Sequence, residues 1–102
     1  MKKIIATLSL LILTAAPVQA DSLKGGYGAC ITEDLFDQFT TAAVKKDERA
    51  FQYLQKNGCF ITKAGIEISI LDVGWTGTTK VRAYVGDATI VLWTNTENIN
   101  RK

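Results

Sequence analysis

The pattern of apolar and polar residues changes its period near residue 60 of the chain. Between residues 32 and 57 the apolar positions recur every three or four residues, which is the spacing of one helical face. Thr32 and Asp47 are typical N-cap residues, and Asn57-Gly58 is a typical helix stop. The pattern therefore predicts two helices that fold back on each other as a hairpin. The apolar stripe of the first helix consists of Leu35, Phe36, Phe39, Ala42 and Ala43.

From residue 60 onward, apolar and polar residues alternate, which is the period of a half-buried β-strand. Three isoleucines alternate in "GIEISIL", and "TKVRAYVG" and "ATIVLWT" follow on either side of a tight turn at Gly86-Asp87. The segment "NTENI" predicts one helical turn before a last short strand that contains Ile99. We therefore expect an α+β fold in which an N-terminal helical hairpin packs on a small antiparallel β-barrel of four or five strands over residues 60–102.

The run over residues 63–99 resembles the bacterial SH3-like (SH3b) domains. The matching features are "KAGIEISIL", Gly74-Trp75, "KVR" at residues 80–82, Gly86, "VLW" ending at Trp93, and "TENI". The resemblance implies that the barrel is SH3-like and half-open, and that it binds peptides or cell-wall components. It does not imply catalysis.

Two segments precede the predicted domain. Residues 1–20, "MKKIIATLSLLILTAAPVQA", combine two lysines, an apolar run and small residues at the end, which predicts a secretory signal peptide. An uncleaved N-terminal anchor is the alternative interpretation. Residues 21–29, "DSLKGGYGA", hold three glycines and predict a flexible leader. We expect a single domain over residues 30–102, periplasmic or secreted, with no stable membrane insertion after signal cleavage.

Charge argues against nucleic acid as a partner. The chain has 12 Lys and Arg against 10 Asp and Glu. Two of the lysines belong to the predicted signal peptide, so 12 − 2 = 10 basic residues balance 10 acidic ones in the remainder. The basic residues are scattered among acidic ones rather than forming a stripe, so we predict that the protein does not bind nucleic acid.

The chain has two cysteines, Cys30 and Cys59, and they flank the predicted helical hairpin. In an exported protein this predicts a disulfide that holds the hairpin closed. Closing a loop of about 30 residues stabilises a fold by roughly 3.6 kcal/mol in the chain-entropy model. A reactive or metal-binding pair is the alternative, but the chain has no histidine and no CxxC spacing.

The residue types present disfavour an enzyme. Without histidine, and with both cysteines bonded, most nucleophile, general-base and transition-metal arrangements are excluded. Asp72 and Asp87 are interpreted as solvated turn acids rather than as an acid pair. We predict no catalytic residue, no cofactor and no metal site.

Aromatic residues of the predicted sheet are the candidates for a binding surface. Trp75, Tyr84 and Trp93 come from the sheet region, with Asp72 and Arg82 near them, and aromatic residues and arginine are favoured in recognition. The alternative is that both tryptophans only pack in the fold. We expect a non-enzymatic periplasmic module that binds a peptide, a peptidoglycan fragment or another envelope protein. A secreted inhibitor that docks on an enzyme through residues 76–79 or 45–48 is the alternative function.

Overall fold

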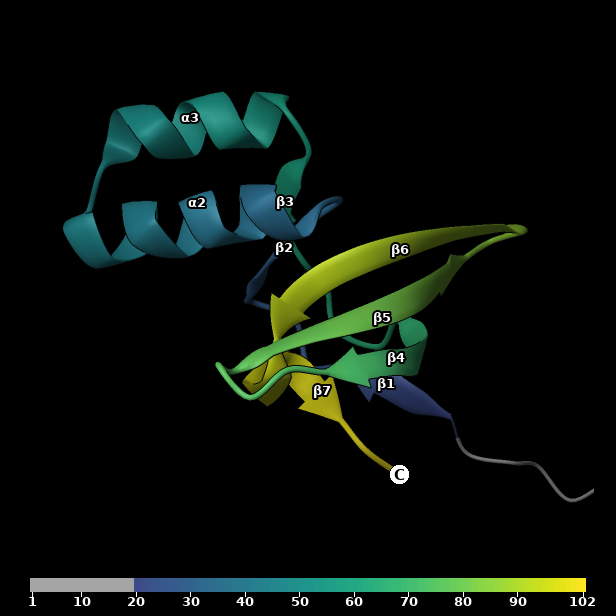
Figure 1. Cartoon of the computed structure of the whole chain (residues 1–102). Coiled ribbons are helices and arrows are strands. Elements are labelled where there is room, and N and C mark those ends of the chain that lie inside the picture. The colour runs from purple at the N-terminus through teal and green to yellow at the C-terminus, as the bar shows by residue number, and fades with distance from the viewer. Residues whose placement is uncertain (1–19) are drawn as a thin grey trace, which may run out of the picture.

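A long curled antiparallel sheet, with two helices packed at one end of it, makes up the protein (Figure 1). The computed structural model describes residues 20–102, so the predicted signal peptide lies outside the described residues except for its last residue. Within this range seven strands follow the order β3-β2-β6-β5-β4-β1-β7. In chain order the elements are β1 Asp21–Leu23, β2 Gly28–Cys30, α2 Glu33–Lys45, α3 Glu48–Lys56, β3 Cys59–Ile61, β4 Glu67–Val73, β5 Thr78–Val85, β6 Ala88–Asn95, the 3-10 turn η1 Thr96–Asn98, and β7 Ile99–Asn100.

The expected architecture, an N-terminal helical hairpin on a barrel of four or five strands, is wrong. The residues expected as a flexible leader form β1 and most of β2, so the helices lie in the middle of the chain between β2 and β3. Both strands lie inside the sheet: β2 pairs with β3 and β6, and β1 pairs with β4 and β7. The result is a seven-stranded half-barrel rather than a small closed one.

Glycine makes this N-terminal segment compact rather than flexible. Gly25 and Gly26 both have positive φ values, +86° and +85°, which turn the chain between β1 and β2. A Cβ atom on Gly25 would lie 2.5 Å from the backbone nitrogen of Ala64, so only glycine allows this approach. The Gly26 N–H donates to the Thr62 carbonyl at 2.9 Å, which fixes the segment to the rest of the fold.

The two helices begin where the sequence predicts. The Thr32 hydroxyl accepts a hydrogen bond from the Leu35 N–H, and the Asp47 carboxylate accepts one from the Ala50 N–H, both at 3.1 Å. These N-caps satisfy backbone donors that the first helical turn leaves free. Gly58, with φ +119°, follows the end of α3.

The helices pack on the sheet through an aromatic cluster. The rings of Phe36 and Phe39 have centroids 6.2 Å apart, and Phe51 meets Phe39 edge-on at 5.0 Å. The predicted disulfide is present: Cys30 of β2 is bonded to Cys59 of β3, directly opposite in the register. The bond therefore joins the strand that enters α2 to the strand that leaves α3, and it lies within the cluster. This helical cluster consists of Cys30, Phe36, Phe39, Ala42, Leu54 and Cys59.

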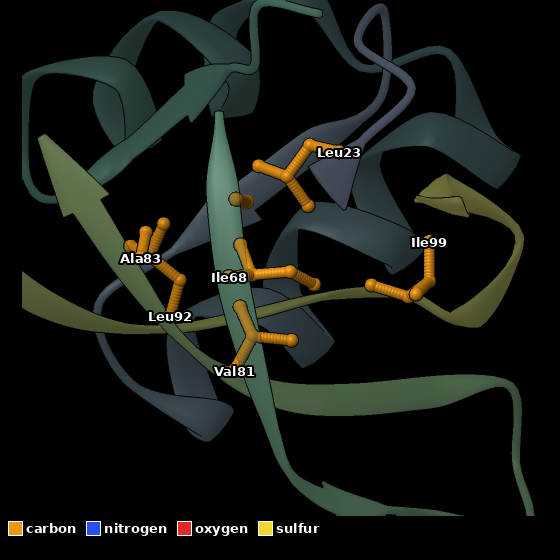
Figure 2. Packing of buried hydrophobic residues seen from close by; sticks show 7 residues of the cluster. Leu23, Ile68, Val81, Ala83, Leu92 and Ile99 are labelled. Carbon is orange, nitrogen blue, oxygen red and sulfur yellow. The ribbon is translucent and has the colours of Figure 1, made fainter. Parts of the chain in front are cut away.

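A second cluster lies on the opposite, inner face of the sheet. Figure 2 shows its side chains, which come from strands far apart in sequence, from β1 to β7. The alternation predicted for β4 and β5 is confirmed, since Ile68, Val81 and Ala83 are all buried on this face. The inner cluster consists of Leu23, Ala29, Ile68, Val81, Ala83, Leu92 and Ile99.

A buried polar network ties the N-terminal segment to the end of the chain. Asn98 is fully buried, and its side-chain nitrogen donates to the hydroxyls of Thr62 and Thr94, each at 3.0 Å. Its side-chain oxygen accepts from the Gly25 N–H at 3.0 Å. The Thr94 hydroxyl donates to the Gly28 carbonyl at 2.7 Å. One side chain thus connects the β1–β2 turn, the β3–β4 segment and β6.

Candidate functional site

The outer face of strands β4, β5 and β6 is the candidate binding surface. Side chains alternate across a sheet, so the positions between the inner-cluster residues point to the opposite face. The helices pack near the β2–β3 end of this face, and most residues beyond it are exposed or half-buried. The outer face, as we define it, consists of Glu67, Ser69, Asp72, Lys80, Arg82, Tyr84, Thr89, Val91 and Trp93.

One row of the outer face runs from an acidic residue to the helical cluster. Asp72, Lys80 and Trp93 are direct cross-strand partners on β4, β5 and β6, and Trp93 in turn pairs with Cys30. The Lys80 ammonium lies 5.3 Å from the centroid of the Trp93 ring, a cation–π arrangement. Trp93 is half-buried and packs against the helical cluster. The structure therefore places Trp93 as a packing residue with one face under Lys80.

Tyr84, Ser69 and Arg82 form a polar group farther along the same face. The Tyr84 and Ser69 hydroxyls are hydrogen-bonded at 2.7 Å, and Arg82 lies two residues before Tyr84 on β5. The Ser69 hydrogen bond, aided by hydrogen bonding and positive charge from Arg82, lowers the pKa of Tyr84 below its ordinary value of 10.0. Desolvation and the charge of Glu67 act in the opposite direction but are outweighed. This group offers hydroxyls and a cation to a polar ligand.

Trp75 lies in the turn between β4 and β5, and it is fully exposed, at 101% of its reference area. The turn is held at both ends: the Gly74 N–H donates to the Thr78 carbonyl, and the Thr96 N–H donates to the Gly77 carbonyl, each at 2.8 Å. An indole that no neighbouring side chain covers is thus presented on a turn with fixed ends. Of the two tryptophans, only Trp75 lacks the packing role that was the alternative interpretation.

Exposed apolar side chains extend this feature back along β4. Leu71 and Val73 are 38% and 49% exposed, and they precede Trp75 at alternate positions. The pairing of β4 with β5 shifts between Ile70 and Asp72, so Leu71 occupies a β-bulge. We call Leu71, Val73 and Trp75 the apolar rim. An exposed apolar group of this kind is typical of an interaction surface.

The structure brings together most of the residues predicted as a site. Asp72, Arg82, Tyr84 and Trp93 share the outer face, whereas Trp75 lies in the turn next to that face. Ser69 and Lys80 are partners that the site prediction missed. The signal for Lys80 was its position next to Val81 in an alternating strand, where polar residues face outward. Leu71 and Val73 were also missed, and the bulge that exposes Leu71 has no signal in the local sequence.

A shallow hollow of about 350 Å³ lies between the two helices. Lys45 and Asp47, at the link between α2 and α3, contribute to its wall. Its lining residues are Asp37, Gln38, Thr41, Ala42, Lys45, Asp47 and Ala50.

The environment of the protein follows from its covalent bond. A disulfide is typical of an oxidising, extracytoplasmic compartment, which is the setting that the Cys30–Cys59 bond indicates. Over residues 20–102, none of the helices has the length and apolar character needed to cross a membrane.

Comparison with known proteins gives no family for the chain. A scan against protein-family models, a search of curated proteins and a search of solved structures each found no match. The resemblance of residues 63–99 to bacterial SH3-like domains therefore stays a prediction, while the four- or five-stranded barrel expected from the alternating strand pattern is replaced by the seven-stranded sheet.

Proposed function

We propose that the protein is an exported, non-enzymatic binding module of the periplasm that holds another envelope protein, or a peptide segment of one. The contact surface is the apolar rim, centred on Trp75, at the end of β4 where both faces meet the turn: Val73, opposite Thr79, lies on the inner side, and Asp72, opposite Lys80, lies on the outer face. The observation that carries this proposal is the complete exposure of Trp75 on a turn that backbone hydrogen bonds hold in place. In such a surface the indole is the anchor and the neighbouring polar residues form the border.

The expected contribution of Trp75 is large enough to measure. A tryptophan buries roughly 150–250 Å² when a partner covers it fully, and apolar burial is worth about 25 cal/mol per Å². Part of this gain offsets the ordering of the two surfaces, so hot-spot tryptophans lose about 2 kcal/mol or more on truncation. A loss of about 2 kcal/mol corresponds to roughly a 30-fold weaker complex.

The outer face supplies the polar border. Arg82 and the Ser69–Tyr84 pair offer donors and a positive charge, and Asp72 offers an acceptor, on strands that the sheet holds rigid. Hydrogen bonds to such groups fix the orientation of a partner, because an unpaired polar group at a covered surface costs about 1–3 kcal/mol. A peptidoglycan fragment would contact the same polar groups, and stacking of a sugar on Trp75 would replace the protein contact.

The experiment compares three forms of the tagged protein in pull-downs from a periplasmic extract, with bound proteins identified by mass spectrometry. Trp75→Ala removes the anchor, and Tyr53→Ala removes another exposed aromatic side chain, 59% exposed on α3, as the matched control. We expect one partner to be captured by the unmodified protein and by Tyr53→Ala but lost with Trp75→Ala. Equal capture by all three forms would remove the apolar rim as the contact surface. Retention on purified peptidoglycan, lost in Trp75→Ala, would identify the cell wall as the ligand instead.

The hollow between the helices favours a second candidate function. It lies beside the 45–48 link that an enzyme-docking inhibitor would use, and Lys45 and Asp47 contribute to its wall. A partner held there would be lost with Lys45→Glu and kept with Trp75→Ala. The same pull-down therefore separates the two functions.

A further inference from the structure

One edge of the sheet is left open in its middle, along the first part of β6. Strand β6 pairs with β5 along its whole length, from Ala88 to Asn95, but pairs with β2 only at Trp93 and Thr94. Figure 1 shows the cause: the β5–β6 hairpin extends away from the helices, beyond the region that β2 covers. Among residues 20–102, segment 88–92 of β6 thus has a strand on one side and none on the other.

The turn that closes the hairpin identifies which backbone groups point to the open side. Val85 and Ala88 are partners across the two-residue turn at Gly86-Asp87, and Gly86 has φ +61°. In a hairpin of this type the closing pair is hydrogen-bonded, and the pattern then alternates along the strand. Ala88, Ile90 and Leu92 therefore face β5. The N–H and C=O groups of Thr89 and Val91 point away from it.

The outward groups of β6 have a partner only where β2 is present. By the same alternation Trp93 also points outward, and it is the residue that pairs with Cys30 of β2. No hydrogen bond within residues 20–102 is recorded to the outward groups of Thr89 or Val91. Four backbone groups on a short edge are thus free, and another extended backbone is the chemical group that matches such a row.

The side chains along this edge are not protected against strand addition. Residues 88–92, "ATIVL", include no charged residue and no proline, which are the usual means of blunting an edge. Val85 and Ile90 lie on the inner side of the hairpin, and they are 55% and 39% exposed because β4 ends its pairing with β5 at Glu67 and Tyr84. An added strand with apolar side chains on that side would cover Ile90, whereas Val85 lies one strand farther away, on β5.

We infer that the open edge of β6 binds an extended segment of a partner polypeptide, which adds a strand beside residues 88–92. The segment carries apolar side chains at alternate positions, facing Ala88 and Ile90, and its backbone pairs with Thr89 and Val91. Its paired part is about five residues long, because β2 closes the edge at Trp93.

The register favours a separate segment over a second copy of this chain. The two-fold axis that would pair the whole open edge with itself, residues 88–92 against residues 92–88, lies at Ile90, and it would put residue 87 of one copy beside residue 93 of the other. That place is taken by Cys30 of β2. A single extended chain has no such turn and can run on past the hairpin tip.

This edge is independent of the proposed role of Trp75. The 74–77 turn and the Gly86-Asp87 turn lie at opposite ends of β5, which is eight residues long, so roughly 25 Å separates them. Loss of binding at one surface is therefore distinguishable from loss at the other.

Nuclear magnetic resonance of the oxidised protein tests the inference. The probe is a synthetic heptapeptide of alternating threonine and valine, and the control peptide has proline in place of its central valine. We expect the probe to shift the amide signals of residues 88–92 and to slow hydrogen exchange of the Thr89 and Val91 amides at least tenfold. The control peptide should do neither.

Two variants locate the contact. Thr89→Pro removes one outward N–H without touching the β5 pairing, and Ile90→Lys places a charge beside the added strand while leaving the backbone intact. Each should weaken binding of the probe at least tenfold. Ile61→Pro, on the outer strand β3 at the end of the sheet, is the matched control and should bind as the unmodified protein does.

Three results would overturn the inference. The first is an absence of shifts up to about 1 mM peptide. The second is shifts confined to residues outside β6, or binding that survives in both Thr89→Pro and Ile90→Lys. The third is protection of the Thr89 and Val91 amides in the free protein that falls on dilution, with a dimer in sedimentation, which would show that a second copy covers the edge.

Discussion

Replacing Asn98 with alanine is expected to be one of the most destabilising single substitutions outside the two apolar clusters. The Asn98 side chain is fully buried and makes three hydrogen bonds, to the Gly25 N–H and to the hydroxyls of Thr62 and Thr94. The two hydroxyls keep their own donor bonds to the carbonyls of Tyr27 and Gly28. The Gly25 N–H is left without a hydrogen-bond acceptor among residues 20–102.

The magnitude follows from these contacts. Three hydrogen bonds at a net value of about 1 kcal/mol each give a loss of roughly 3 kcal/mol. The loss is smaller for the two threonine hydroxyls, because each still donates its own hydrogen bond and only stops accepting one. It is larger for the Gly25 N–H, which is left without an acceptor. We therefore expect a loss of about 2–4 kcal/mol, on the order of the values for buried polar groups. For a domain of this size, about 3 kcal/mol lowers the melting temperature by roughly 12–24 °C.

Urea denaturation followed by far-ultraviolet circular dichroism and by tryptophan fluorescence measures this loss. Trp93, half-buried under the helices, reports on unfolding, whereas the fully exposed Trp75 does not. Asn100→Ala is the matched control, because Asn100 lies two residues farther on and its side chain makes no hydrogen bond within residues 20–102. This substitution should cost less than about 0.5 kcal/mol.

A double-mutant cycle with Thr94→Val tests the network itself. The two residues share one hydrogen bond, so the combined loss should be smaller than the sum of the single losses by about 1 kcal/mol. A destabilisation by Asn98→Ala no larger than that of Asn100→Ala would refute the reasoning, and so would strict additivity in the cycle.

Three further predictions follow from other parts of the fold. Replacing Cys30 and Cys59 together with alanine should lower the free energy of unfolding by roughly 3.6 kcal/mol in urea titrations, and an unchanged midpoint would contradict this. Ser69→Ala should raise the pKa of Tyr84 in an ultraviolet phenolate titration, since the Ser69 hydrogen bond is the main cause of the lowered pKa. Because the Tyr84 phenol loses its proton at lower pH in the folded state than in the unfolded state, the free energy of unfolding should rise with pH from the folded pKa of Tyr84 up to about 10. A free energy of unfolding that stays constant over this range, in the unmodified protein as in Ser69→Ala, would contradict the lowered pKa. Gly25→Ala should destabilise by more than about 1 kcal/mol in thermal melts, because its φ is +86° and its Cβ would meet the backbone of residue 64, and a melting temperature unchanged from the unmodified protein would contradict this.

The two proposed surfaces suit a small protein that acts by contact. The apolar rim presents an anchor residue at one end of β5, and the open edge of β6 presents backbone groups at the other. The disulfide is buried under the helices, far from the apolar rim, and its Cys30 pairs with Trp93 at the point where the open edge of β6 ends. The disulfide therefore stabilises the part of the sheet from which the β5–β6 hairpin extends, and it leaves both surfaces accessible to a partner.

The sequence by itself determined the local elements. The caps at Thr32 and Asp47 define where the helices begin, because a capping side chain bonds to backbone only three residues away. Alternation of apolar residues likewise determined which residues of β4 and β5 face inward, and the presence of two cysteines determined the disulfide. In each case the interaction is local or has one possible partner.

Only the tertiary structure determined that residues 21–30 form strands, and only it determined how many strands the sheet contains. Strand β1 pairs with β4 and β7, and the Gly25 N–H bonds to Asn98, 73 residues away in sequence. Three-residue strands on either side of a glycine turn are too short to show a period of their own, so the composition of this segment suggested flexibility, whereas its long-range hydrogen bonds give it structure. The candidate surfaces depend on the same long-range pairing: β2 ends beside Trp93 and leaves β6 open, and the bulge at Leu71 exposes part of the apolar rim. The local sequence supplies the side chains of both surfaces, but the pairing of strands distant in sequence determines which of these side chains are exposed to solvent.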